Sequence, residues 1–202
     1  MQWSRTAMNK ADKTGSPASN GSDIVIRPAV IGDVPEIMEI LQPYIEEDIL
    51  LPVSVYRLFE HIRYFVVGER GGQVIGCGSL VIVWHDLAEV RSLAVRRGCR
   101  GGGVGGRIVD ELIAEAEELG VARVFALTYE TSFFGRHGFE VVDRDTLPHK
   151  VWKDCTNCAR FTHCDEIAVA RTLIPEDQRK PEPALPDMQQ DPTLIMPSPA
   201  PQ

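Results

Sequence analysis

Ten residues near the middle of the chain have the types and spacing of an anion-binding loop. They are Arg97-Gly98-Cys99-Arg100-Gly101-Gly102-Gly103-Val104-Gly105-Gly106, and an amphipathic helical pattern follows them at once. Glycine adopts positive φ without a steric penalty and lets a ligand approach the backbone closely. The first N–H groups of a helix have no internal partner, and the helix dipole adds partial positive charge there. The run therefore predicts a site for a phosphate or diphosphate group. A flexible glycine-rich loop without a ligand is the alternative.

A second chemical group is a cluster of thiols near the C-terminal end. Cys155, Cys158 and Cys164 fall within ten residues, and His163 precedes the last of them. Three thiols and an imidazole are suitable ligands for a tetrahedral zinc ion. Their spacing is not that of a standard zinc finger, so a redox-active Cys-x-x-Cys pair and a set of unligated thiols stay open. A one-to-one zinc content by elemental analysis would support the metal site.

Length, charge and composition limit the class of protein. The chain has 202 residues, 44% of them hydrophobic, and a formal net charge of -8. This suits one folded domain and argues against nucleic acid as the main partner, which would require a broad basic face. No apolar stretch reaches the length of a membrane span, and residues 1–22 lack the apolar core of a secretory signal. We therefore expect a cytoplasmic protein with no membrane partner. Five cysteines, an odd number, fit thiols or metal ligands there better than a disulfide framework.

Composition also divides the chain. Residues 1–22 are polar and predict a disordered leader, and residues 175–202 are rich in proline and predict a disordered tail. The folded domain is therefore expected over residues 23–174. Within it, alternating and helical hydrophobic patterns predict the order β-α-α-β-β-β-α-β-α-β-β, which implies a mixed sheet with helices on both faces. The expected helices cover residues 34–45, 55–63, 104–119 and 131–137, and the expected strands cover residues 24–29, 64–69, 74–83, 88–95, 123–128, 140–142 and 165–173.

Three segments of this pattern, taken in order, resemble the GNAT superfamily of N-acetyltransferases. They are Glu89-Val90-Arg91-Ser92-Leu93-Ala94-Val95, then Arg100-Gly101-Gly102-Gly103-Val104-Gly105, then Phe133-Phe134-Gly135-Arg136-His137-Gly138-Phe139. The resemblance implies a mixed, mostly antiparallel twisted sheet whose central strand pair is splayed by a bulge in the strand that contains Leu93 and Val95. It also implies acetyl-CoA as the co-substrate.

The same resemblance implies which residues contact acetyl-CoA. The diphosphate would be held by the loop and helix start at Arg100, Gly101, Gly102, Gly103, Val104, Gly105 and Gly106. The pantetheine arm would pair with the backbone of Leu93, Ala94 and Val95, and Phe134 would lie beside it. A backbone N–H at Leu93 would polarise the acetyl carbonyl, which is the catalytic contribution expected of this strand.

Glu89 is the predicted general base, because relatives in this superfamily carry a catalytic glutamate at the corresponding position. A structural or substrate-orienting carboxylate is the alternative role. The amine would attack the thioester directly, without a covalent enzyme intermediate. Many family members use a tyrosine as the general acid where this chain has Phe134, so water, Tyr129 or His137 would have to replace it. For His137, capping of its helix is the alternative role.

A closer resemblance is to the short, single-domain amino-acid N-acetyltransferases of the N-acetylglutamate synthase type. The segments that carry it are Leu50-Leu51-Pro52-x-Ser54, Phe65-Val66-Val67-x-Glu69, Trp84-x-Asp86 through Val95, Leu127-Thr128-Tyr129-Glu130-Thr131-x-Phe133-Phe134, and Leu147-Pro148-x-Lys150-Val151-Trp152-x-Asp154-Cys155. Val53 stands where close relatives often have arginine. A glutamate acceptor has two carboxylates and requires cations; Arg91 and Lys150 are the predicted contacts, with Arg136 as a further candidate.

The predicted function is therefore transfer of an acetyl group from acetyl-CoA to the α-amino group of L-glutamate or L-glutamine, the first step of arginine biosynthesis. Two alternatives stay open. One is acetylation of another amine, such as a protein N-terminus, and the other is a non-catalytic acetyl-CoA sensor. Both a monomer and a homodimer fit the sequence.

Overall fold

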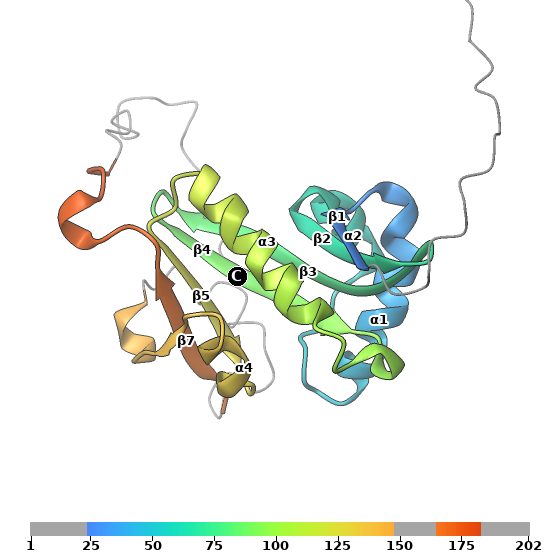
Figure 1. Ribbon diagram of the computed structural model, residues 1–202. Helices are drawn as coiled ribbons and strands as arrows, with labels where there is room; N and C mark the ends of the chain where they lie inside the picture. Colours follow the sequence, from blue (N-terminus) through green and yellow to red (C-terminus); the bar gives the residue numbers. More distant parts are fainter. Residues whose placement is uncertain (1–23, 148–164, 183–202) are drawn as a thin grey trace, which may run out of the picture.

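The computed structural model describes residues 24–147 and 165–182, which form a twisted sheet with helices packed on both of its faces (Figure 1). The strands are β1 (Ile24–Pro28), β2 (Phe65–Arg70), β3 (Gln73–Trp84), β4 (Leu87–Val95), β5 (Arg123–Thr128), β6 (Glu140–Val141) and β7 (Ile167–Thr172). The α-helices are α1 (Val34–Glu46), α2 (Val55–His61), α3 (Val104–Glu118) and α4 (Thr131–Gly135). This order and the mixed sheet confirm the predicted fold class.

The sheet order is β1-β2-β3-β4-β5-β7-β6. Neighbouring strands of the described sheet run antiparallel, except that β4 and β5 run parallel. A parallel connection needs a long crossover, and α3 provides it. The molecule therefore has an N-terminal antiparallel half and a C-terminal half that meet at β4 and β5.

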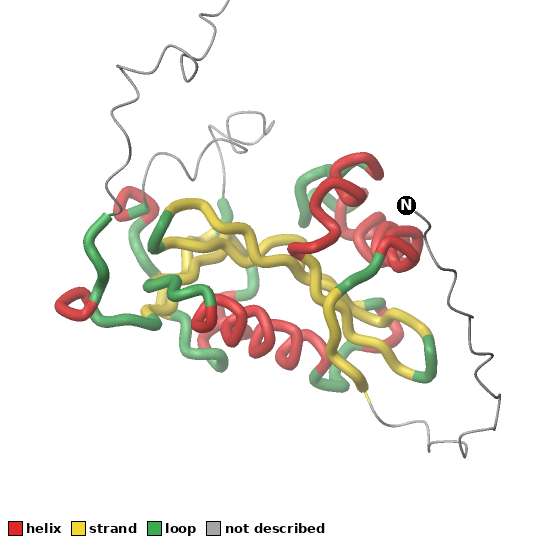
Figure 2. The backbone as a smooth tube through the Cα atoms, turned by 90° about the horizontal axis from the view of Figure 1, so that it is seen from above, coloured by secondary structure: helices red, strands yellow, loops and turns green. Residues whose placement is uncertain are grey.

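Alternation of side chains along the strands gives the sheet an apolar surface on each face. On one face, α3 packs Ile108 and Leu112 against the sheet, together with Val66 of β2. On the other face, α1 and α2 pack against Phe65 and Val67 of the same strand. Figure 2 shows α3 on the opposite side of the sheet from α1 and α2. The apolar stripe predicted for α3 is the buried one.

The predicted splay between the central strands is present. Parallel pairing of β4 with β5 covers three residue pairs, from Leu87 with Arg123 to Glu89 with Phe125. β4 continues to Val95, so the rest of it has no pairing with β5. The edge of β4 that faces β5 is therefore open from the residue after Glu89.

β4 also contains a bulge just beyond the point where the strands separate. Its register with β3 passes from Ser79–Arg91 to Cys77–Ala94, so Ser92 and Leu93 together lie opposite Gly78. An extra residue reverses the side-chain alternation of a strand. Ala94 accordingly packs on the α1 side, whereas Leu93 packs on the α3 side.

Asp33 and Ser54 stand at the starts of α1 and α2, where both residue types favour an N-cap, but only Ser54 makes the capping bond. Ser54 does cap α2, since its Oγ accepts a hydrogen bond from the Arg57 N–H at 3.3 Å. Asp33 precedes α1 but makes no side-chain bond to it. Its carboxylate instead accepts bonds from Arg27 at 2.7 and 2.9 Å and from the Val30 N–H at 2.8 Å. These bonds join β1 to the start of α1 through the Asp33 carboxylate. The hydrogen bond from Arg27 also lowers the pKa of Asp33.

The described chain continues past the predicted domain end at residue 174, through a 3-10 turn at Glu176–Gln178, to residue 182. None of the described helices has the length and apolar character needed to cross a membrane.

Candidate active site

The glycine run forms the turn between β4 and α3. A 3-10 turn covers Arg97–Cys99, and Gly103 is the N-cap of α3. Gly101 and Gly103 have φ of +83° and +77°, in the left-handed region that only glycine adopts freely. No side chain caps the start of α3. The first turn of the helix therefore directs its N–H groups outward, as the predicted anion site requires.

Arg100 of this loop is held by a residue of α1. Its Nε and Nη2 donate to the hydroxyl of Tyr44 at 3.1 and 2.8 Å, and its guanidinium lies 5.1 Å from the centre of the Tyr44 ring. The same hydroxyl donates to the backbone carbonyl of Val95 at 2.5 Å. One buried tyrosine therefore joins the end of β4 to the cation of the loop.

The bulge of β4 is fixed by two side chains of β3. Ser79 Oγ donates to the Arg91 carbonyl at 3.1 Å, and Cys77 Sγ donates to the Ser92 carbonyl at 3.7 Å. Ser92 itself has a φ of +50°. Complete burial raises the pKa of Cys77 to about 12, so this thiol stays protonated and can act as a donor.

The bulge separates the predicted base Glu89 and the predicted substrate contact Arg91 from the residues predicted to pair with the pantetheine arm. Glu89 and Arg91 share one face of β4, as their spacing predicts. A regular strand would place Leu93 and Val95 on that face as well, but the bulge turns them toward α3. The Arg96 N–H donates to Ile75 in β3 at 2.8 Å, so the N–H and carbonyl of its neighbour Val95 point to the open edge.

Glu89 and Arg91 are paired with each other. Arg91 Nε donates to Glu89 Oε2 at 2.6 Å, and Arg91 Nη2 lies 2.5 Å from the same oxygen. The Glu89 residue is 7% exposed. A buried carboxylate beside a guanidinium, at the point where β4 and β5 separate, suits a site that receives a charged amine.

Ring side chains of α4 and of the turn that follows it lie against the start of α3. Phe133 lies 3.7 Å from the position of a Cβ at Gly105, and His137 lies 2.9 Å from that of Gly106. Phe134 is 5% exposed and packs edge-on between Phe133 and Phe139. Contact with the pantetheine arm stays a prediction for Phe134, and Phe133 is the ring that faces the loop.

The two predicted substitutes for the general acid both have partners. Tyr129 donates its hydroxyl to Asp165 at 2.8 Å, and His137 Nδ1 lies 2.8 Å from Asp110 of α3. The His137 side chain makes this contact with α3, and its backbone carbonyl accepts from Arg171 at 2.9 Å.

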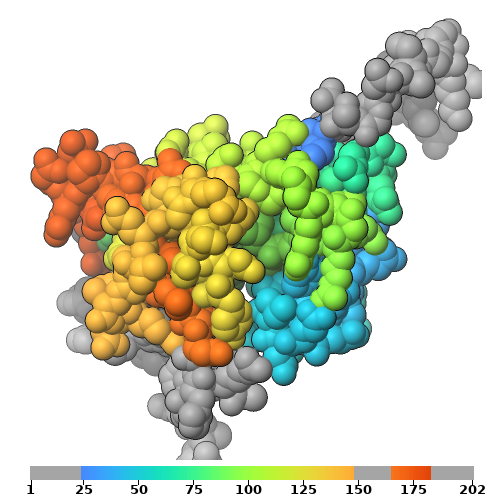
Figure 3. Space-filling view, turned by 60° about the horizontal axis from the view of Figure 1, so that its bottom comes forward, coloured from blue at the N-terminus to red at the C-terminus, as the bar shows by residue number. Residues whose placement is uncertain are grey.

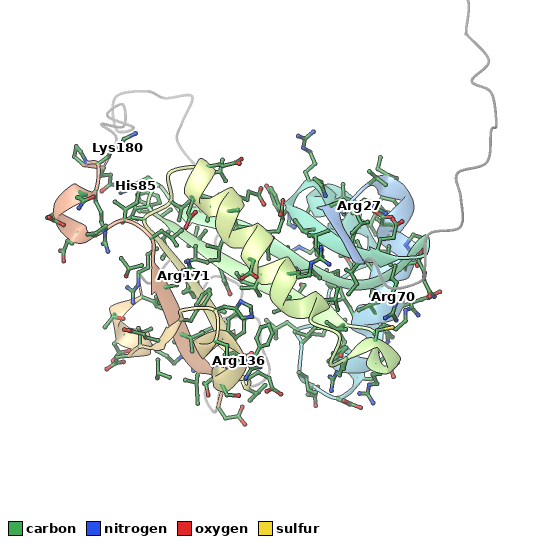
Figure 4. The ribbon with its side chains drawn as sticks, viewed as in Figure 1. Arg27, Arg70, His85, Arg136, Arg171 and Lys180 are labelled. Atoms are coloured by element: carbon green, nitrogen blue, oxygen red, sulfur yellow. The ribbon has the colours of Figure 1, made fainter. Side chains whose placement is uncertain are left out.

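One predicted substrate contact lies away from the Glu89–Arg91 pair, and several other predicted site residues lie outside the described residues. Arg136 is the C-cap of α4, the helix that packs on the α3 side of the sheet, and its guanidinium lies 5.9 Å from the centre of the Phe133 ring (Figure 4). Lys150 and the predicted zinc ligands Cys155, Cys158, His163 and Cys164 lie outside the described ranges. Within residues 24–147 and 165–182, no group of His, Cys, Asp or Glu side chains is arranged to hold a metal ion.

Sequence reasoning missed Tyr44, Ser79 and Cys77, which position the site without belonging to a motif. Tyr44 lies with Ile37 and Leu41 on the buried stripe of α1. A hydroxyl group on such an apolar stripe is the sequence signal that indicates a buried hydrogen bond.

Figure 3 shows the face of the molecule on which the segments around residues 50, 100 and 130 converge.

The sequence pattern of the Acetyltransferase (GNAT) family matches residues 34–139, just over half of the chain, and spans α1 to the end of the α4 segment. The chain belongs to the GNAT acetyltransferase family. This confirms the predicted family and the predicted acyltransferase class. The matched region contains the open strand, the glycine loop and the aromatic helix.

Relatives of this GNAT chain are similar over most of its folded part. An uncharacterized N-acetyltransferase of Chlorobaculum tepidum is 41% identical over 152 residues, covering 75% of this chain and 98% of the relative. An amino-acid acetyltransferase of Mycobacterium tuberculosis is 39% identical over 133 residues, covering 64% of this chain and 76% of the relative. The similarity thus extends to the amino-acid acetyltransferases, as the second resemblance predicts.

Solved structures of similar proteins support the same family and the same acyl donor. A Mycobacterium tuberculosis protein in complex with CoA and the ligand NLQ has a TM-score of 0.67 and 32% identity, covering 74% of this chain and 99% of that one. N-acetylglutamate synthase from Neisseria gonorrhoeae, complexed with coenzyme A and N-acetyl-glutamate, has a TM-score of 0.69 and 31% identity. The match covers 78% of this chain but 37% of the synthase. CoA in these neighbours supports acetyl-CoA as the acyl donor.

Proposed function

We propose that this chain transfers the acetyl group of acetyl-CoA to the α-amino group of L-glutamate or L-glutamine, the first step of arginine biosynthesis. The observation that carries the proposal is the Glu89–Arg91 pair on one face of β4, where the strand separates from β5. It offers a carboxylate for an ammonium group and a guanidinium for a carboxylate. The names of the mycobacterial and neisserial relatives support the same class of acceptor.

The donor side of the proposal uses the loop and the open strand edge. Arg100 and the N–H groups of residues 101–106 hold the diphosphate, and the uncapped α3 start with its two left-handed glycines fits that group. Backbone groups of Leu93, Ala94 and Val95 align the pantetheine arm. Of these, Val95 has its N–H on the open edge, and the bulge removes Leu93 from the regular ladder, so its N–H serves as the donor to the acetyl carbonyl.

The acceptor side assigns one role to each member of the pair. Glu89 removes a proton from the ammonium group of the amino acid, because an amine must be neutral to attack the thioester. Arg91 binds a carboxylate of the acceptor while it contacts Glu89, since a guanidinium has five N–H donors on more than one edge. The pair thereby aligns the amine and the carboxylate of one small molecule.

A thiol-release assay with acetyl-CoA and a panel of amines tests the proposal. L-Glutamate or L-glutamine should be the preferred acceptor among free amino acids, an aminoglycoside and a peptide N-terminus. Preference for a cationic amine would overturn the acceptor, and CoA binding without turnover of any amine would overturn the enzymatic role.

Variants of Arg91 test how the acceptor is bound. Arg91→Gln should raise KM for the amino acid about 10- to 100-fold, as expected for loss of a charge-assisted hydrogen bond, and should leave KM for acetyl-CoA unchanged. The exposed Arg63 supplies the matched control, Arg63→Gln. An equal rise in both KM values for Arg91→Gln would argue against a contact with the acceptor.

A further inference from the structure

The loop between β4 and α3 carries three arginines that α1 holds in two different ways. Arg96 pairs with Glu39 at 3.3 Å, and Arg97 pairs with Glu47. Arg100 is instead held by the hydroxyl of Tyr44. Among the described residues, therefore, two cations of the loop are neutralised by carboxylates, one on α1 and one at its C-cap, and the third has a neutral partner.

The partner's chemistry matters because it decides what charge remains for a ligand. A carboxylate fixes a guanidinium but cancels its charge, so an arriving anion must compete with it. A phenol fixes the guanidinium by accepting two hydrogen bonds and leaves the positive charge intact. Of the three arginines, Arg100 is thus the cation best prepared for an anion.

The direction of the hydroxyl proton fixes the arrangement further. Tyr44 donates to the Val95 carbonyl at 2.5 Å, so its oxygen presents lone pairs to Arg100. The Arg100 edge formed by Nε and Nη2 therefore faces the protein, and Nη1 lies on the opposite edge. Tyr44 is 6% exposed and is packed in the α1 core, so its ring is a rigid support.

We propose that Tyr44 is a positioning residue that presents the uncompensated charge of Arg100 to the diphosphate of acetyl-CoA. This rests on the proposed contact between Arg100 and the diphosphate. Tyr44 touches no reacting atom; it reduces the freedom that Arg100 would otherwise lose on binding. The nearby pairs Glu39–Arg96 and Glu47–Arg97 hold the loop against α1, and Tyr44 orients the cation that binds.

Tyr44→Phe tests the proposal because it removes the hydroxyl and keeps the ring. The dissociation constant for CoA, measured by calorimetry on the full chain, should rise about 3- to 10-fold, as expected when one flexible side chain must be ordered on binding. The turnover rate at saturating acetyl-CoA should stay unchanged. Tyr56→Phe is the matched control, since Tyr56 lies on α2 and is 83% exposed.

S-acetylpantetheine separates this role from a general structural one, because it lacks the diphosphate. Tyr44→Phe should leave kcat/KM for this donor unchanged while lowering it for acetyl-CoA. Equal losses with both donors would overturn the proposal, since they would place the effect on the Val95 end of β4 or on folding.

Arg100→Gln distinguishes failure of this proposal from failure of its premise. If Arg100→Gln leaves CoA affinity unchanged, the contact with the diphosphate is wrong. If it weakens CoA binding and Tyr44→Phe does not, the role of Tyr44 is wrong. The double variant should bind CoA no more weakly than Arg100→Gln alone, because both changes remove one coupled contact.

Discussion

At the scale of single residues, the site depends on side chains that hold other groups in place. Glu89 and Arg91 contact each other, Tyr44 orients Arg100, and Ser79 fixes the carbonyl of Arg91. All three contacts are made between groups of the chain itself. Such preorganisation lets the site act without reorganising its dipoles during the reaction.

Replacement of the proposed base is the most direct prediction at this scale. Glu89→Gln should lower kcat about 100-fold or more at pH 7, where the acceptor amine is protonated and needs a base. The loss should shrink as the pH rises toward the pKa of the amine, because the amine then arrives neutral. A pH–rate profile checks this. The exposed Glu140→Gln is the control, and a Glu89→Gln profile parallel to that of the unaltered protein would contradict the assignment.

The buried thiol of Cys77 predicts a second pH dependence, this time of stability. Burial raises its pKa from 9.0 to about 12 in the folded protein. The folded state therefore keeps a proton that the unfolded state loses above pH 9, so this contribution is intact below pH 9 and declines as the pH rises. From pH 8 to pH 10 the loss should be about 1.4 kcal/mol.

Urea unfolding of the unaltered protein and of Cys77→Ala over this pH range measures the contribution. The variant should be less stable at pH 8, because the substitution leaves a small cavity. Its stability should nevertheless fall less steeply with pH. Parallel curves for the two proteins would show that Cys77 titrates in the folded state.

At the scale of elements, β4 can serve both halves of the proposed site because its bulge changes the face that its side chains occupy. Before the bulge, Glu89 and Arg91 lie on the acceptor side; after it, Leu93 and Val95 lie on the α3 side, and the Val95 N–H lies on the open edge. A regular strand would place all four side chains on one face. The bulge thus lets one strand carry both the residues proposed to bind the acceptor and the edge proposed to bind acetyl-CoA.

The loop after β4 gives the prediction at this scale. Gly103→Ala forces alanine into a φ of +77° and should lower the free energy of unfolding by about 1–2 kcal/mol. Gly102→Ala is a matched control one residue away, because Gly102 is not at positive φ and its Cβ would lie 3.7 Å from the nearest atom. Chemical denaturation measures both. Equal losses for the two variants would contradict a role for the left-handed conformation.

The sequence predicts these elements well because their patterns are local. The stripe of Ile108 and Leu112 is enough to identify α3, and the glycine pair at Gly71 and Gly72 is enough to place the β2–β3 turn. Local patterns do not indicate the bulge, because its supports Ser79 and Cys77 belong to another strand; the family resemblance alone implies it. Asp33 shows the same limit: it precedes a helix, but its partner is Arg27 of β1.

At the scale of the whole molecule, the splay makes the sheet two units with a limited connection. β4 and β5 share three residue pairs, and α3 bridges the two sides by packing on Val66 of β2 and Val124 of β5. A co-substrate lying along the open edge would contact β4, the α3 start and the α4 segment together. Binding there should therefore stabilise the molecule as a unit.

Hydrogen exchange with and without CoA tests this coupling. CoA at 100 times its dissociation constant should raise the free energy of unfolding by about 2.7 kcal/mol, because it binds the folded chain and not the unfolded one. Beyond this global effect, local protection should increase at the Val95 amide on the open edge and at the first turn of α3. The locally opening amides of the outer strands β1 and β6 should change little. Protection concentrated in those outer strands, with Val95 unaffected, would place CoA elsewhere and would contradict the donor site as proposed.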